Sequence, residues 1–133
     1  MVPEFLKTKS KQERPLVLII DEEETVRDLY GDWFTIQGFQ VMCAVGFEGL
    51  SYALWRESPQ LIVTELRARD LTLKQLIARL RCDETTRCIP VIVLTTSCDA
   101  SKLNDAKETG AAVVLPKLTH FDLLRAWVAA LCG

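Results

Sequence analysis

Short apolar runs rich in β-branched residues recur along the chain. The clearest runs are residues 16–20 (LVLII), 61–64 (LIVT) and 91–94 (VIVL), and weaker ones lie at 112–115 and 39–44. Continuous apolar runs of this length are typical of strands that are buried on both faces, as in a parallel sheet. The pattern therefore predicts five strands.

The segments between these runs have the spacing of helices. Val26, Leu29, Tyr30, Trp33 and Phe34 repeat at intervals of three and four residues, which places them on one face of a helix. The three tryptophans are all predicted to be core or half-buried helix residues.

Two later helices carry start signals in the sequence. Thr72 and Gln75 have the spacing of a capping box, and Thr119 and Asp122 repeat the spacing before the last helix. Gly110 marks the end of the helix before the last strand. Strands that alternate with helices predict a parallel sheet covered by helices on both faces.

The chain has 133 residues, which fits one domain. Five βα units in this length predict a flavodoxin-like (βα)5 doubly wound parallel sheet with strand order 2-1-3-4-5. Residues 1–14 carry four basic residues against two acidic ones and are predicted to form a disordered basic tail. Residues 15–133 are predicted to form the domain.

Composition narrows the function classes. Apolar residues make up 49%, enough for a sizeable core, and the net charge of −2 argues against direct nucleic-acid contact by this domain. The chain has neither an apolar run of 18 residues nor the apolar core of a signal peptide, so we expect a cytoplasmic protein without membrane contact. Five cysteines without a CxxC pair predict buried or half-buried thiols in a reducing compartment, with no disulfide framework or zinc site.

Polar residues stand where the predicted strands end. Asp21 and Glu22 follow the first strand of the chain, and Glu65, Thr95 and Lys117 end the third, fourth and fifth. In doubly wound sheets, the site forms outside the carboxyl ends of the strands, so these side chains are expected to converge. Taken singly, the acidic pair could merely cap a helix and the lysine could be a surface residue.

In this order, the segments IIDEEETVRDLY, GFQVMCAV and TGAAVVLPK resemble the receiver domain of two-component response regulators. The resemblance implies that Asp21 and Glu22 form the acidic pair, that Thr95 is the switch hydroxyl and that Lys117 binds the phosphoryl group. It also implies a Mg²⁺ ion held by Asp21, Glu22 and the residue at position 65. That residue would be an aspartate that accepts a phosphoryl group, whereas this chain has Glu65.

Glutamate has the charge of aspartate but is longer by one methylene, about 1.5 Å. In-line attack tolerates little misplacement, and about 1 Å can cost roughly a hundredfold in rate. We therefore predict that Glu65 is a poor acceptor. Its carboxylate is expected to reach Lys117 or the Thr95 hydroxyl instead and to hold a partly active-like state without phosphorylation.

Other positions also depart from the family pattern. The loop at 66–70 (LRARD) lacks the family's Pro-Gly, so Arg67 or Arg69 could fold back onto Glu65 and fill the pocket. Val114 replaces the family's aromatic ring, and Leu118 replaces the proline after the lysine. Every oxygen ligand for Mg²⁺ is nominally present although the loop and the lysine segment are altered, so the sequence leaves Mg²⁺ binding open.

These features favour an atypical member of the family, a pseudo-receiver. We expect a signal-transduction domain without catalytic turnover that acts through protein contacts. Its partner would be a sensor kinase, an output domain or another signalling protein, and the resemblance implies that the last strand and helix can carry homodimer contacts. The alternatives are a working phosphoacceptor in a phosphorelay with an altered, Mg²⁺-dependent site, and a flavodoxin-like small-molecule binder. The last would need a glycine-rich phosphate loop that the sequence lacks.

Overall fold

The computed structural model describes residues 13–133, and the predicted tail lies almost wholly outside this part of the chain. Five parallel strands form one sheet in the order β2-β1-β3-β6-β7. Its strands are β1 Leu16–Ile20, β2 Gln40–Ala44, β3 Leu61–Thr64, β6 Val91–Thr95 and β7 Val113–Pro116. The predicted fold class and strand order are confirmed.

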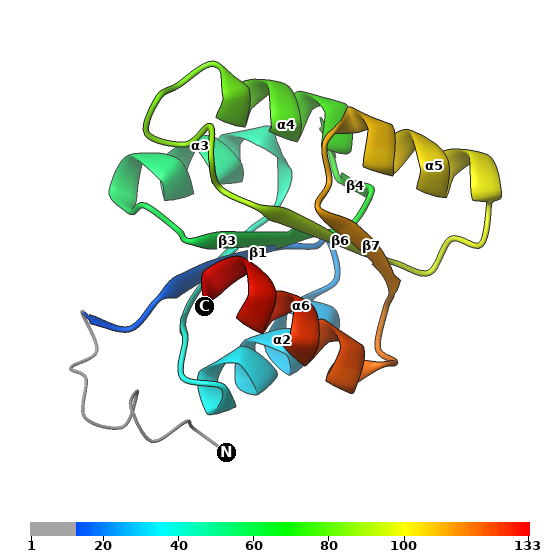
Figure 1. Cartoon of the computed structure of the whole chain (residues 1–133). Coiled ribbons are helices and arrows are strands. Elements are labelled where there is room, and N and C mark those ends of the chain that lie inside the picture. The colour runs from blue at the N-terminus through cyan, green and yellow to red at the C-terminus, as the bar shows by residue number, and fades with distance from the viewer. Residues whose placement is uncertain (1–12) are drawn as a thin grey trace.

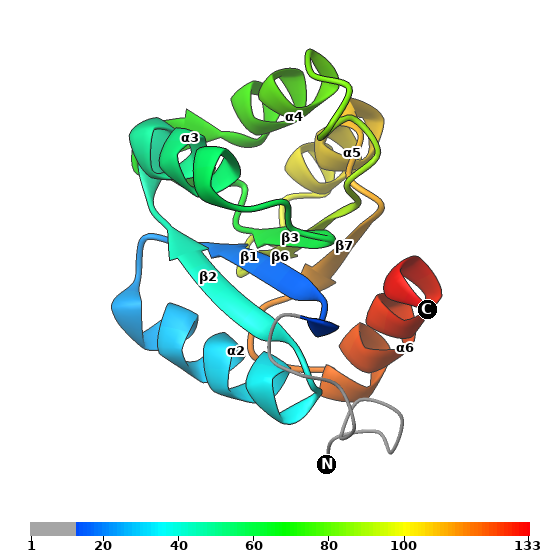
Figure 2. The same ribbon diagram turned by 90° about the vertical axis from the view of Figure 1, so that its left-hand side faces the viewer.

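Helices cover both faces of the sheet (Figures 1 and 2). The helices are α2 Glu24–Ile36, α3 Gly46–Arg56, α4 Leu73–Arg81, α5 Ala100–Thr109 and α6 Phe121–Cys132. Helices α2 and α6 lie on one face, and α3, α4 and α5 lie on the other (Figure 2). This three-layer arrangement buries β1 and β6 completely, which explains why residues 16–20 and 91–94 are all apolar.

The two halves of the core differ in character. Under α2 and α6, the buried side chains include Tyr30, Phe34 and Phe39, with tilted or edge-on ring contacts to their neighbours. Under α3, α4 and α5, the core is aliphatic and built around leucines such as Leu50, Leu76 and Leu80. Each half is one cluster of buried residues, so the central strands are packed on both faces.

The predicted start of α4 is confirmed, and that of α6 is wrong. Thr72 caps α4 with a full capping box, in which Gln75 bonds back to the Thr72 backbone. Helix α6 instead begins after His120, which has a left-handed backbone with φ of 53° and no side-chain cap. The chain already turns at Leu118, whose φ is 62°, so Thr119 does not stand at the helix start.

Some burial expectations were also wrong. Trp55 is 80% exposed, because it lies on the side of α3 opposite the buried residues Leu50 and Ala53, and Leu29 is 46% exposed at the edge of the buried face of α2. Four of the five thiols are exposed, although all five are free. No helix among residues 13–133 is long and apolar enough to cross a membrane.

A two-stranded hairpin, β4 Arg67–Ala68 and β5 Leu71–Thr72, follows β3 directly. The sequence did not predict it. At its tip, Asp70 Oδ1 accepts a hydrogen bond from the backbone N–H of Phe47, 2.9 Å away, at the start of α3. The hairpin thereby joins the segment after β3 to the neighbouring helix.

Candidate functional site

Three charged side chains meet at the carboxyl ends of β1, β3 and β7. Lys117 Nζ lies 2.8 Å from Asp21 Oδ2 and 2.8 Å from Glu65 Oε2. The side chains of Lys117, Asp21 and Glu65 are only 5%, 7% and 18% exposed. The convergence expected from parallel strand ends therefore occurs for these three residues, which we call the ion-pair pocket.

The remaining carboxylate oxygens of the ion-pair pocket are held by backbone groups. Asp21 Oδ1 accepts from the N–H of Glu23 at 2.9 Å, and Glu65 Oε1 accepts from the N–H of Leu66 at 2.7 Å. Every oxygen of the two carboxylates thus has a partner. Charge-assisted bonds of this kind fix the carboxylates in orientation as well as in position.

Burial and charge act on Lys117 in opposite directions. Burial alone would lower the pKa of the ammonium group, but its hydrogen bonds and charge interactions with Asp21 and Glu65 outweigh that effect and raise the pKa. The lysine therefore stays protonated, and one positive charge serves two carboxylates. It is a buried ion-pair residue, not a surface lysine.

Tyr30 positions the lysine segment, a role that the sequence did not reveal. Its hydroxyl accepts a hydrogen bond from the N–H of Leu118 at 2.6 Å, while Lys117 N–H donates to the Thr95 carbonyl at 3.0 Å. No peptide bond in residues 13–133 is cis. These two hydrogen bonds and the positive φ of Leu118 therefore set the position of Lys117. Burial raises the pKa of Tyr30, so its hydroxyl stays neutral. A buried tyrosine hydroxyl needs a polar partner, so the position of Tyr30 on an apolar helix face was the sequence feature that could have indicated this role.

Thr95 is buried at the end of β6, beside this arrangement. Its hydroxyl accepts from the N–H of Ser97 at 3.1 Å. Among the described residues it makes no hydrogen bond with Glu65. Of the two partners expected for Glu65, the structure brings Lys117 and not Thr95 into contact.

Comparison with known proteins assigns the family. Residues 17–129 match the family described as the response regulator receiver domain. The chain belongs to the response regulator receiver domain family. Receiver domains are signalling modules rather than typical enzymes, so the chain has a signal-transduction role with other signalling proteins.

Solved receiver domains share the fold. A two-component response regulator from Clostridium difficile is 20% identical with a TM-score of 0.80, covering 90% of this chain and 96% of that one. A response regulator receiver protein from Pseudomonas putida is 24% identical, with a TM-score of 0.78 and coverages of 88% and 97%. The chemotaxis response regulator CheY4 of Vibrio cholerae is 18% identical, with a TM-score of 0.78 and coverages of 89% and 98%. No curated protein sequence matches the chain.

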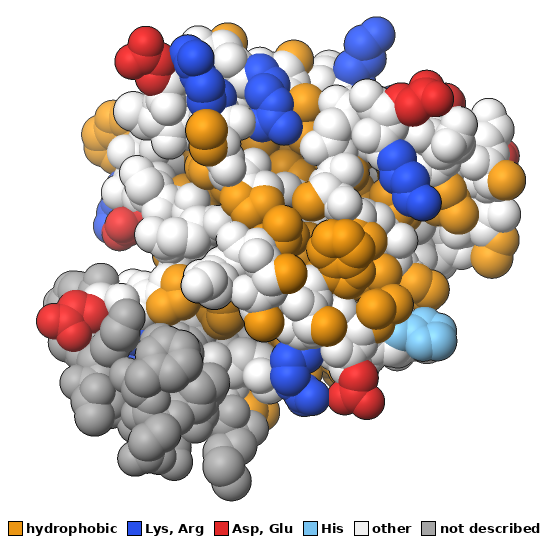
Figure 3. All heavy atoms as spheres, viewed as in Figure 1, with side chains coloured by type: hydrophobic (Ala, Val, Ile, Leu, Met, Phe, Trp, Pro, Cys, Tyr) orange, Lys and Arg blue, Asp and Glu red, His pale blue; other side chains and the backbone are white. Residues whose placement is uncertain are grey.

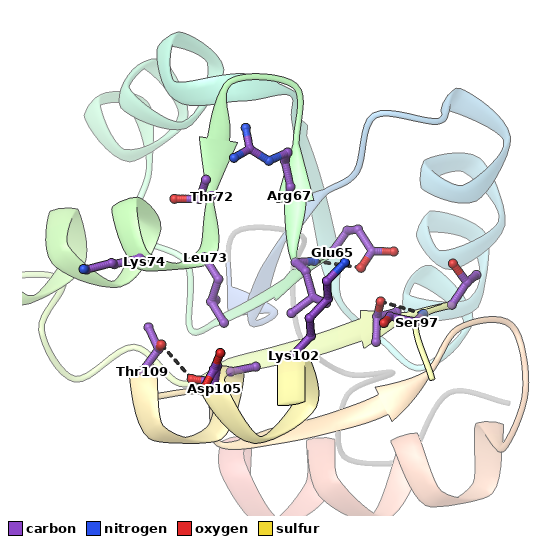
Figure 4. A pocket seen from close by; sticks show the side chains of 13 residues that line it. Glu65, Arg67, Thr72, Leu73, Lys74, Ser97, Lys102, Asp105 and Thr109 are labelled. Atoms are coloured by element: carbon purple, nitrogen blue, oxygen red, sulfur yellow. Dashed lines mark hydrogen bonds between the residues drawn. The ribbon is translucent and has the colours of Figure 1, made fainter. Parts of the chain in front are cut away.

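Two residues that the sequence predicted for the site do not join the ion-pair pocket of this receiver domain. Glu22 is exposed and, within residues 13–133, forms no ion pair with Lys117; its backbone carbonyl accepts a hydrogen bond from Arg27 at 3.0 Å. Arg67 lies in the hairpin, is exposed, and points away from Glu65 (Figure 4). Within residues 13–133 it forms no ion pair with Glu65, because the β4–β5 pairing holds its backbone in the hairpin.

The donor set for Mg²⁺ fits the ion poorly as it is arranged. The oxygens of Asp21 and Glu65 are engaged by Lys117 and by backbone N–H groups, and Glu22 does not join them. No group of three His, Cys, Asp or Glu in the described part of the chain is placed to hold a metal. Mg²⁺ usually keeps an octahedral shell with one or two carboxylates, and here both would first have to leave the lysine.

Proposed function

We propose that this receiver domain signals through protein contacts without phosphorylation at position 65. The observation that carries the proposal is the double engagement of the Glu65 carboxylate. Oε2 is paired with Lys117 at 2.8 Å, and Oε1 accepts from the Leu66 N–H at 2.7 Å. Attack on a phosphoryl donor would require one oxygen to leave its partner, so the resting arrangement opposes the reaction.

The same contacts support a fixed state. Glu65 places negative charge on Lys117 by itself, as a bound phosphoryl group would in a working receiver. The pair therefore holds the segments after β3 and β7 together without any covalent change. In this proposal, Asp21, Glu65 and Lys117 are structural residues, and Thr95 is not a switch.

Exposed apolar side chains support a role in protein contact. Leu118 and Leu123, before and within α6, are 45% and 46% exposed. Apolar side chains gather over the side of the molecule where α6 and β7 lie (Figure 3). Such a face suits a protein partner or a second copy of the chain.

The experiment is intact mass spectrometry after incubation with Mg²⁺ and a small acyl phosphate. The protein and its Glu65→Asp variant are run in parallel. We expect no mass gain for the protein itself. A gain of one phosphoryl group by the unmodified protein would overturn the proposal and establish the alternative, a working phosphoacceptor with an altered site.

The variant separates two explanations. If only Glu65→Asp gains a phosphoryl group, the surrounding residues are competent and Glu65 alone blocks transfer. If neither gains one, the pocket is changed beyond one residue. Partner binding is then compared between the protein and Glu65→Gln, for which we expect weaker binding. Equal partner affinity and unchanged conformation would contradict the fixed-state proposal.

A further inference from the structure

A cavity of about 710 Å³ opens beside the ion-pair pocket. Its walls come from the hairpin after β3, the first turn of α4, the segment after β6 and one face of α5 (Figure 4). Glu65 stands at the border between the cavity and the ion-pair pocket. The volume falls in the range of small-molecule sites, about 300–1,000 Å³.

Three cationic side chains from three different segments line this cavity. Arg67 comes from β4, Lys74 from the first turn of α4, and Lys102 from α5. In Figure 4, Lys102 extends from its helix toward the side where Glu65 lies, whereas Arg67 and Lys74 extend away from it. Among the residues that the structure describes, none of the three has a carboxylate within 4.0 Å.

The carboxylates of the lining do not neutralise these cations. Glu65 already has both oxygens engaged by Lys117 and by a backbone N–H. Asp105 stands three residues after Lys102 on α5, yet no ion pair forms between them. The lining therefore carries unmatched positive charge, which concentrates anions in a concave site.

Neutral donors add to this preference. The cavity meets the N-terminus of α4, where the helix dipole favours a negative group. The side chain of Thr96 also faces the cavity, and its hydroxyl makes no hydrogen bond within residues 13–133. A hydroxyl, a helix end, a guanidinium and two ammonium groups together suit the oxygens of phosphate.

We propose that this cavity binds a small phosphorylated metabolite through Lys102 together with Arg67 and Lys74, whose exposed side chains turn toward the bound phosphate. The lining has no aromatic ring on which a nucleobase could stack, and its apolar part is aliphatic, formed by Leu66, Leu73 and Ala106. The expected ligand is thus compact and not aromatic, with one or two phosphate groups. Binding there would contact the segments after β3 and β6 and could act as a non-covalent input to the domain.

The test uses inorganic pyrophosphate as the probe, in Mg²⁺-free buffer at about 0.15 M salt, where diffuse surface attraction is screened. Calorimetric titration is expected to show saturable binding. Backbone amide NMR shifts are expected at Lys74, Thr96 and Lys102. Citrate, a tricarboxylate of about the same charge as pyrophosphate near neutral pH, serves as the second probe and is expected to bind at least about tenfold more weakly.

Variants locate the site. We expect Lys102→Met and Arg67→Met each to weaken pyrophosphate binding by about tenfold or more. Lys107→Met is the matched control, because Lys107 is exposed on the same helix but does not line the cavity. It should leave the dissociation constant unchanged. Far-UV circular dichroism confirms that each variant is folded.

Three results would overturn the proposal. They are no saturable binding of pyrophosphate, an equal loss of pyrophosphate binding in Lys107→Met, and citrate binding as tight as pyrophosphate binding. The proposal does not depend on whether position 65 accepts a phosphoryl group. Pyrophosphate binding leaves the protein mass unchanged, so this experiment and the acyl phosphate experiment fail independently.

Discussion

Lys117 and Lys102 lie near the same edge of the sheet, yet their surroundings are opposite. Lys117 is nearly buried and pairs with two carboxylates at 2.8 Å. Lys102 is exposed in an open cavity and has no carboxylate partner among the described residues. A charge removed from water must be matched inside the protein, whereas an exposed one is solvated and can stay available for a ligand. The ion-pair pocket should therefore contribute to stability, whereas the cavity should contribute to ligand recognition.

The largest expected effect comes from Lys117→Met. It leaves Asp21 and Glu65 adjacent and mostly buried without their cation, which we expect to lower the free energy of unfolding by about 3–5 kcal/mol. Urea denaturation at pH 7 measures it. A loss below about 1 kcal/mol would mean that Lys117, like Lys102, contributes little to stability. The triple variant with Asp21→Asn and Glu65→Gln should recover part of the loss, because no unpaired charge remains.

Alkaline pH should weaken the ion-pair pocket selectively. The pKa of Lys117 is raised in the folded protein. Its stabilisation is therefore complete below the unfolded value of about 10.4 and is lost as pH rises through the folded value, by at most about 1.4 kcal/mol per pH unit. Urea denaturation at pH 9 and pH 11 should show a larger loss in the protein than in Lys117→Met.

Ionisation of Tyr30 also lowers stability at alkaline pH, because burial raises the pKa of Tyr30 in the folded protein. Tyr30→Phe is the control for that contribution. The loss of stability caused by Tyr30 is measured with this variant and subtracted. If the remaining losses between pH 9 and pH 11 are equal in the protein and in Lys117→Met, the pairing of Lys117 with its carboxylates does not stabilise the fold.

A smaller loss is expected from Glu65→Gln. The amide retains an oxygen for Lys117 or for the Leu66 N–H, but the bond is no longer charge-assisted. Asp21 still pairs with Lys117, so we expect a loss of about 1 kcal/mol in urea denaturation. A loss as large as that of Lys117→Met would mean that Asp21 contributes little.

The smallest effect is expected in the cavity. Lys102→Met should change the free energy of unfolding by less than about 0.5 kcal/mol, because an exposed, unpaired lysine stabilises nothing that the structure shows. Thermal denaturation without added anions measures this. A loss above about 1 kcal/mol would assign Lys102 a structural role and weaken the contrast with Lys117.

The sequence predicted the sheet well because its signals are local. Runs such as residues 61–63 and 91–94 are apolar throughout, and both are buried on both faces in the structure. The meeting of Asp21, Glu65 and Lys117 also followed, because parallel strands end at one edge. These predictions needed only strand order and the positions of strand ends.

Other features depend on contacts between distant residues and had no local signal. The Tyr30 hydroxyl meets the Leu118 N–H across 88 positions of the chain. The hairpin replaced the expected return of Arg67 to Glu65, because four residues at 67–72 pair with one another. The cavity joins Arg67, Lys74 and Lys102 from separate segments, and each alone reads as an ordinary surface cation.

The bond between Asp70 and the start of α3 also restricts how this sequence can evolve. Gly46 has a φ of 77°, and a Cβ there would lie 2.6 Å from Asp70 Oδ1. A side chain at position 46 therefore meets both backbone strain and the Asp70 carboxylate. We expect Gly46→Ala to cost less stability in an Asp70→Ala background, and equal costs in both backgrounds would contradict this coupling. Acceptable substitutions at position 46 thus depend on position 70, so the order in which the two change decides which descendants can fold.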